Sequence, residues 1–236
     1  MSKELALCNF KAVLLDVDGT LVDSLAKIIN GLGDVFEKYT GERPAETKIK
    51  SLIGLPLDVQ MGKFVKPGVS GSELEEMIQY TIFCYEQHRH LEREIAPAME
   101  SLKLCHEAGI KTALVTSKNA PEMAIFVPTF SGMEYVDATV CASDVARPKP
   151  DPECVFRACD LLQVAPEDAI YIGDAIYDIQ SAQAAGSTPV AVAYGSATAE
   201  DLAQEKPAML LETPDALLNW TRASLLEPTC RERKPI

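Results

Sequence analysis

The sequence predicts an α/β fold, a doubly wound parallel sheet with an all-helical domain inserted near its start. Short runs of branched apolar residues such as Val13-Leu14-Leu15 recur along the chain, and such runs are typical of strands buried on both faces. Helical patterns alternate with these runs, as they do where helices connect parallel strands. Between residues 24 and 93, however, the pattern is helical throughout, which predicts the inserted domain.

The composition limits what the protein can bind. Its 236 residues are enough for one large domain or two small ones. The net charge of −13 argues against nucleic acid and against an anionic membrane surface as partners, because both attract clustered Lys and Arg. No apolar run approaches the roughly 20 residues that span a bilayer. The seven cysteines lack metal-ligand spacing and the N-terminus lacks a signal peptide's apolar segment, so we expect reduced thiols and a cytoplasmic location.

Four helices are expected in the inserted block. In the first, apolar residues recur at three- and four-residue steps over 25–39, and Gly41 is its stop signal. A short second helix is expected near 45–52. Pro56 suits the first turn of a third helix, and the capping box at 72–75 opens a long fourth one.

After the inserted block, helices and strands alternate to the C-terminus. A loop is expected at 66–68, within the block, and a polar tail after the last helix. We divide the chain into a core of residues 1–20 and 96–236 and a cap of residues 21–95. Strands are expected near 13–15, 111–116, 137–141, 169–174, 189–193 and 208–211, and core helices near 97–108, 120–127 (cut by Pro128), 151–162, 178–185 and 214–222.

Polar side chains follow four of the expected strands at their carboxyl ends. In a parallel sheet these ends share one edge, where open α/β sheets bind ligands. Each residue alone has an ordinary explanation as a turn residue, a helix cap or a solvated charge. Their occurrence in order, at the same end of four strands, predicts a shared site. Its members are Asp16 and Asp18 after the first strand, Thr116 after the second, Lys149 after the third, and Asp174 and Asp178 after the fourth.

These segments resemble the motifs of the haloacid dehalogenase-like phosphatase superfamily. The expected helical cap after the first motif resembles the cap of one subgroup, which contains phosphoglycolate phosphatases, pyrophosphatases and β-phosphoglucomutases. The chain departs from the family at Ala175, where a Ser or Thr is common. The matching segments are Asp16-Val17-Asp18-Gly19-Thr20 for the first motif, Thr116 for the second, Lys149 in Lys-Pro-Asp-Pro for the third, and Gly173-Asp174-x-x-x-Asp178 for the fourth.

The resemblance implies a Mg²⁺-dependent phosphatase with a Rossmann-like core, acting on a small phosphorylated metabolite of the phosphoglycolate type. Asp16 would attack phosphorus and form an aspartyl-phosphate, while Asp18 would transfer protons. Mg²⁺ would be bound by the carboxylates of Asp16 and Asp174 and by the backbone carbonyl of Asp18, with Asp178 nearby or bound through water.

The resemblance implies that the remaining expected site residues would contact the substrate. Thr116 would hydrogen-bond a phosphoryl oxygen, and Lys149 would neutralise the phosphoryl group and Asp16. Backbone amides in two turns could supply further donors, and a cap segment resembles the one that faces the active site in this subgroup. The turns contain Gly19 and Ser117-Lys118, and the cap candidates are Gly54, Gln60 and Lys63.

Several alternatives stay open on the sequence alone. A β-phosphoglucomutase-like sugar phosphomutase or a pyrophosphatase would use the same two acids in the first motif. A receiver-like phospho-switch also combines a parallel sheet with acids and a Lys, but it does not need a helical lid of about 70 residues over the nucleophile. The protein could be a monomer or a homodimer.

Overall fold

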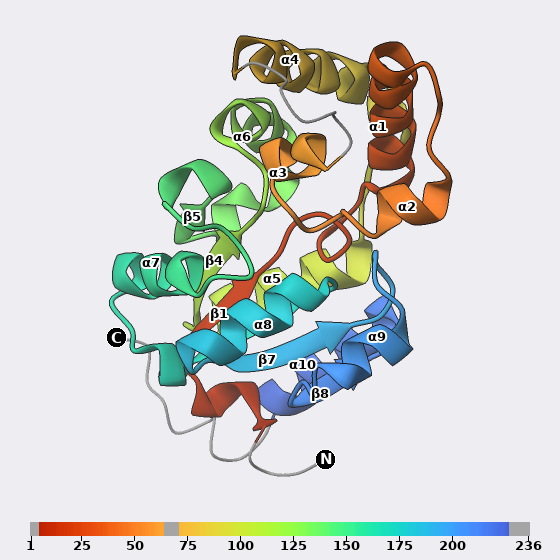
Figure 1. The fold of residues 1–236 in the computed structure, drawn as a ribbon. Coiled ribbons are helices and arrows are strands. Elements are labelled where there is room, and N and C mark those ends of the chain that lie inside the picture. Colours follow the sequence, from red (N-terminus) through yellow and green to blue (C-terminus); the bar gives the residue numbers. More distant parts are fainter. Residues whose placement is uncertain (1–4, 64–70, 227–236) are drawn as a thin grey trace.

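A six-stranded parallel sheet lies beneath a group of helices in the computed structural model of the protein (Figure 1). The structure describes residues 5–63 and 71–226. The expected loop at 66–68 and the polar tail beyond residue 226 lie outside the described residues.

The strand order of the sheet is β5-β4-β1-β6-β7-β8, and every neighbouring pair is parallel. The first strand of the chain therefore lies in the centre, between β4 and β6, where both of its edges are hydrogen-bonded. All six expected strands are confirmed. They are β1 (Ala12–Leu15), β4 (Lys111–Val115), β5 (Ala138–Val140), β6 (Ala169–Gly173), β7 (Thr188–Val192) and β8 (Met209–Leu211).

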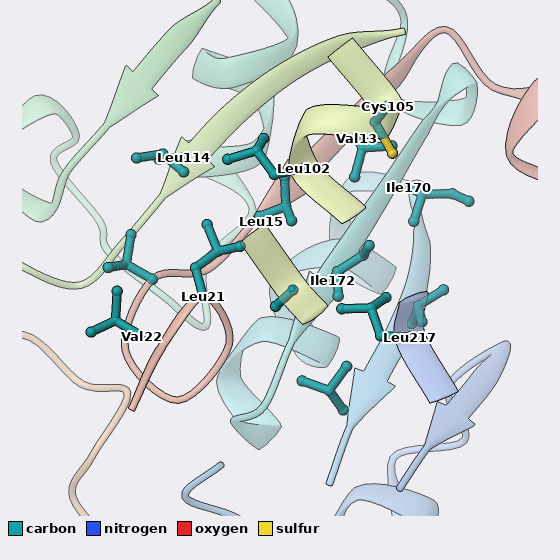
Figure 2. Packing of buried hydrophobic residues seen from close by; sticks show 14 of the residues in the cluster. Val13, Leu15, Leu21, Val22, Leu102, Cys105, Leu114, Ile170, Ile172 and Leu217 are labelled. Carbon is teal, nitrogen blue, oxygen red and sulfur yellow. The ribbon is translucent and has the colours of Figure 1, made fainter. Parts of the chain in front are cut away.

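Alternate residues of β1 face opposite sides of the sheet, and both sides are covered by helices. Val13 and Leu15 belong to a buried cluster that contains Leu102 and Leu217 (Figure 2). Leu14 belongs to a second cluster on the other side of the sheet. The doubly wound architecture is therefore confirmed. The first cluster is covered by α5 (Ala96–Glu107) and α10 (Pro214–Leu225), and the second by α7 (Glu153–Leu162) and α8 (Ile176–Ala185).

One core helix ends at a proline as expected, and another was not expected. α6 (Ala120–Phe126) ends before Pro128 and continues as a 3₁₀ turn, because proline cannot donate to the preceding turn. α9 (Ala199–Gln204) was not expected, because a helix of 6 residues is too short to show a periodic pattern of apolar residues. The 3₁₀ turns within the described ranges are η2 (Leu7–Asn9), η3 (Arg89–Leu91), η4 (Val127–Thr129), η5 (Ser131–Tyr135), η6 (Ala142–Asp144) and η7 (Pro166–Asp168).

Four helices above the sheet enclose a hydrophobic core of their own, and we call them the cap. Leu32 and Phe36 from the first helix, Met61 from the third and Met77 from the fourth are buried in it. A separate core agrees with an inserted domain, although the division at residues 20 and 96 stays a prediction. The helices are α1 (Leu25–Thr40), α2 (Glu46–Lys50), α3 (Leu57–Gly62) and α4 (Gly71–Gln87).

Two short strands join the chain where it enters and leaves the cap. β2 (Val22–Asp23) pairs antiparallel with β3 (Arg93–Glu94). The expectation of helices alone from 24 to 93 was therefore wrong at its end, because a two-residue strand shows no alternation. This pairing holds the two chain segments that connect the cap to the core next to each other.

None of the described helices combines the length and the hydrophobicity that spanning a bilayer requires. Five cysteines are free and buried, as expected of small apolar side chains: Cys84, Cys105, Cys141, Cys154 and Cys159. Cys8 differs from the expectation of reduced thiols, because it is disulfide-bonded.

Candidate active site

Three carboxylates converge at the carboxyl edge of the sheet. Asp16 follows β1, Asp174 follows β6, and Asp178 lies in the first turn of α8. One oxygen of each lies within 4.8 Å of the others, and all three side chains are buried. Charges of one sign this close raise the free energy of the folded protein unless a cation compensates them.

Lys149 supplies one positive charge to this cluster. Its ammonium donates to Oδ1 of Asp178 at 2.7 Å and lies 3.1 Å from Oδ1 of Asp16. It also donates to the backbone oxygen of Val115 at 2.8 Å, so the loop after β5 is tied to the end of β4. Burial alone would lower the pKa of Lys149, but the charges of Asp16 and Asp178 outweigh it and raise that pKa above its ordinary value. The lysine is therefore charged where it meets the two acids.

The carboxylate of Asp174 is held from both sides. Oδ2 accepts from the backbone N–H of Ser196 at 2.7 Å and from its hydroxyl at 2.8 Å, while Oδ1 accepts from the hydroxyl of Thr20 at 2.9 Å. Burial, together with the charge of Asp178, raises the pKa of Asp174 to about 6, although the bonds from Ser196 and Thr20 oppose that rise. Burial also raises the pKa of Asp16. Both carboxyls therefore favour a bound cation or a proton.

Glycines make room for Asp174. A Cβ on Gly19 would lie 2.2 Å from Oδ2 of Asp174, and one on Gly195 would lie 2.3 Å from the same atom. Gly19 also has a φ of +81°, which L side chains rarely adopt. Its backbone N–H, expected as a substrate donor, donates to the oxygen of Val22 at 2.7 Å. Gly19 therefore serves the site by its missing side chain.

Asp18 lies apart from the three clustered carboxylates. Its two oxygens lie 3.0 and 2.8 Å from the ammonium of Lys118, and Oδ1 accepts from the hydroxyl of Ser24 at 2.6 Å. Burial would raise the pKa of Asp18, but the charges of Lys118 and Lys27 and the two hydrogen bonds lower it below the ordinary value. Asp18 is therefore ionised in the substrate-free protein, with its side chain turned toward the base of the cap.

The sequence predictions missed this role of Lys118. We expected only its backbone amide to be used, and that N–H donates to Oγ1 of Thr116 at 3.2 Å. The hydroxyl of Thr116 therefore keeps its own hydrogen for a phosphoryl oxygen. A lysine two residues after a motif threonine was a usable signal, but its partner Asp18 is 100 residues away in the chain.

A hydrogen bond joins the core to the cap beside the site. The hydroxyl of Ser117 donates to the backbone oxygen of Gly54 at 2.6 Å. Gly54 and Gln60 line the same cavity as Asp16, Asp18 and Thr116, as expected of cap residues that face the site. Lys63, in contrast, is exposed at the end of α3 and is not among the described residues that line the cavity.

The three clustered carboxylates fit Mg²⁺. They offer hard oxygen donors, which this ion prefers. Hydrogen bonds from Ser196 and Thr20 orient Asp174, as residues that hydrogen-bond a metal ligand usually do. The carboxylate of Asp18 does not belong to this cluster. Binding of Mg²⁺ by the backbone carbonyl of Asp18 stays a prediction.

The haloacid dehalogenase-like hydrolase family model matches residues 13–192. The chain belongs to the haloacid dehalogenase-like hydrolase family. It is therefore an enzyme, a hydrolase of the phosphatase type, as the four motifs predict. The matched stretch contains the three clustered carboxylates, Thr116, Lys149 and the cap, while Ser196 lies just beyond its end.

Curated relatives and solved structures agree with this membership. The chain is 30% identical over 211 residues to pyrophosphatase PpaX of Bacillus velezensis, covering 89% of this chain and 95% of that one. It is 27% identical over 214 residues to a phosphoglycolate phosphatase of Pseudomonas fluorescens, covering 88% and 78%. The crystal structure of a hydrolase from Pseudomonas syringae has the same fold, with a TM-score of 0.80 at 21% identity over 91% of this chain and 98% of that one.

Proposed function

We propose that this protein is a Mg²⁺-dependent phosphatase that hydrolyses a small phosphorylated metabolite through an aspartyl-phosphate intermediate. The observation that carries the proposal is the buried group of Asp16, Asp174 and Asp178 with the ammonium of Lys149 between Asp16 and Asp178. This arrangement fits a carboxylate nucleophile beside a cation site. Family membership and the names of the relatives support it.

In the first half of the reaction, Asp16 forms a bond to phosphorus while the bond from phosphorus to the leaving oxygen breaks. Lys149 contacts Oδ1 of Asp16, so Oδ2 is the oxygen available for attack. Asp18 gives a proton to the leaving oxygen. Because Asp18 is ionised in the substrate-free protein, it must take up that proton when the phosphate ester binds.

In the second half, Asp18 removes a proton from a water molecule whose oxygen attacks phosphorus. The bond to Asp16 breaks, and phosphate leaves. Splitting one hard displacement into two is the advantage of a covalent intermediate. The Thr116 hydroxyl donates to a phosphoryl oxygen, and the charge of Lys149 offsets that of the transferred group.

Asp16 and Asp174 would hold Mg²⁺, with Asp178 beside them. When bound, the ion neutralises negative charge that develops on the phosphoryl oxygens. Two neighbours of Asp174, Thr20 and Ser196, hold that carboxylate in place and would orient it as a ligand.

Replacing the nucleophile tests this proposal. Asp16→Asn should abolish release of phosphate from p-nitrophenyl phosphate in the presence of Mg²⁺, because an amide is a far weaker nucleophile. Asp58→Asn is the matched control, since Asp58 is exposed in the first turn of α3. Full activity of Asp16→Asn would refute the aspartyl-phosphate mechanism.

Pyrophosphate hydrolysis is the second candidate, because relatives that cover most of the chain are named pyrophosphatases. Phosphoglycolate is the corresponding monoester candidate. A sugar phosphomutase of the β-phosphoglucomutase type would return a hexose 6-phosphate from the 1-phosphate with little free phosphate, so a product assay separates it from both.

The working environment that we propose is the cytoplasm. Five of the described cysteines are free thiols, as in a reducing compartment, whereas the disulfide at Cys8 argues in the other direction. The partner is a small phosphorylated metabolite, and the protein works as a monomer or a homodimer.

A further inference from the structure

Gln60 lines the catalytic cavity and has a buried acceptor without a partner among the described residues. Its side chain is 7% exposed. The amide nitrogen Nε2 donates to the backbone oxygen of Leu55 at 2.6 Å. The amide oxygen Oε1 has no hydrogen-bond partner among the described residues. Buried polar atoms almost always have a partner, so this oxygen calls for a ligand or a water molecule.

The polarity of this group is fixed by its neighbour. Turning the amide over would place Oε1 against the oxygen of Leu55, with two acceptors facing each other. Gln60 therefore offers an acceptor, which binds the hydrogen of a hydroxyl group. The same oxygen repels the oxygens of a carboxylate or a second phosphate.

Two charged groups that line the cavity, Lys118 and Glu122, already have partners, which leaves Oε1 of Gln60 as an acceptor for the leaving group. Lys118 donates to Asp18, and Oε2 of Glu122 accepts from the backbone N–H of Asn119. The ring of Tyr85 also lines the cavity. The rest of the cap wall is apolar and consists of Ile28, Ile53, Leu55 and Leu57.

The cavity also limits size. Its volume in the substrate-free protein is only about 30 Å³, so the cap must move for any phosphate ester to enter, and a small leaving group requires the least movement. A larger groove of about 490 Å³ shares Ile53, Ala175 and Ser196 with it. Gly54 packs against Ala175 at this shared wall. A bulky leaving group would have to separate Gly54 from Ala175 to reach the groove.

We propose that Gln60 determines substrate specificity, with Oε1 accepting a hydrogen bond from a hydroxyl group of a small, uncharged leaving group. The favoured substrates are then phosphomonoesters of small polyols, in preference to diphosphates and phosphocarboxylates. This inference rests on the proposed phosphatase function and names the class of substrate for the same site.

A pair of matched substrates tests the proposal without any mutation. Glycerol 3-phosphate and n-propyl phosphate share a three-carbon chain, but only the first carries hydroxyl groups. Wild-type kcat/KM should be about 10- to 100-fold higher for glycerol 3-phosphate, since losing one buried hydrogen bond leaves Oε1 unpaired. Pyrophosphate and phosphoglycolate should also be poorer substrates than glycerol 3-phosphate. Equal kcat/KM for the matched pair, or a preference for either anionic compound, would overturn the proposal.

A variant assigns the preference to Gln60. Gln60→Met keeps the length of the side chain and removes the acceptor, so the ratio of the two kcat/KM values should fall toward one. Gln79→Met makes the same change on the exposed surface of α4 and should keep the wild-type ratio. If Gln60→Met lowers both values in equal proportion, Gln60 is structural and the proposal is wrong. If no phosphomonoester is hydrolysed with Mg²⁺, p-nitrophenyl phosphate included, the proposed function itself fails.

Discussion

Gly54 of the cap and Ala175 of the core approach each other so closely that Gly54 has no room for a side chain. A Cβ on Gly54 would lie 2.7 Å from Cβ of Ala175 and 3.2 Å from Cδ2 of Tyr177. The backbone oxygen of Gly54 meanwhile accepts from the hydroxyl of Ser117. These contacts hold the cap loop against the ends of the strands, where it closes the catalytic cavity.

Gly54→Ala should therefore impair closure of the cap. Gly54 has a φ of +95° and Gly41 one of +79°, so alanine at either position costs about 1 kcal/mol of backbone strain. Only Gly54 has a neighbour in the way, since nothing lies within 4 Å of a Cβ on Gly41. We expect kcat/KM to fall about tenfold or more for Gly54→Ala and to stay near wild type for Gly41→Ala, with similar losses of Tm.

A double variant makes this prediction stricter. Ala175→Gly removes the methyl group that Gly54→Ala would strike, so the double variant should recover part of the lost kcat/KM. Additive losses would show that the two positions do not interact and would contradict the closure argument.

Lys118→Met should impair proton transfer by Asp18. Removing one partner of a buried ion pair leaves the other charge uncompensated. The loss of kcat should be greater for an alkyl phosphate than for p-nitrophenyl phosphate, whose leaving group needs no proton. Lys63→Met is the control, because Lys63 is exposed. Equal losses for good and poor leaving groups would mean that Lys118 does not act through Asp18.

The fold could be predicted because its signals are local. Each strand of the sheet is a short run of apolar residues, and each major helix has its own periodicity. In β1, Val13 and Leu14 pack on opposite faces, which is why the run contains no polar residue. The two-residue strands β2 and β3 carry no such signal, since their pairing depends on where the cap begins and ends.

The clustered acids and Lys149 of the candidate site were predictable, but their contacts, and partners such as Ser196, were not. The positions of Asp16 and Asp174 follow from strand order, so their convergence could be foreseen. The contact of Ser24 with Asp18 could not: Ser24 occupies the position before α1, where a serine side chain usually caps the helix, but its hydroxyl donates to Asp18 instead. Tertiary contacts of this kind depend on geometry that no sequence pattern contains.

Ser196→Ala should weaken Mg²⁺ binding while leaving the carboxylate ligands in place. The hydroxyl of Ser196 donates to Oδ2 of Asp174, and its loss removes one of the bonds that orient this carboxylate. Loss of such an outer partner typically costs 10- to 100-fold in metal affinity. The Mg²⁺ concentration for half-maximal activity should rise accordingly, whereas Ser51→Ala, an exposed control in the cap, should not change it. An unchanged Mg²⁺ dependence would show that the hydroxyl of Ser196 does not orient Asp174 for the metal.

The raised pKa of Asp174 predicts how pH and Mg²⁺ act together on stability. Its pKa of about 6 in the folded protein exceeds the ordinary 3.8, so its stabilising contribution is complete below about pH 4 and is lost as pH rises through 6. The loss is about 3 kcal/mol in the metal-free protein. Mg²⁺ binds the ionised carboxylate, so the rise in Tm on adding Mg²⁺ should grow between pH 5 and 7.

Asp174→Asn isolates this effect from all other titrating groups. Without Mg²⁺, the Tm of wild type minus that of the variant should fall as pH rises from 4 to 7, because only wild type must bury an additional charge. The variant should also lose the stabilisation by Mg²⁺. Thermal unfolding at several pH values, with and without Mg²⁺, measures both differences. A Tm difference that stays constant from pH 4 to 7 would show that Asp174 ionises in the folded protein as easily as in the unfolded chain.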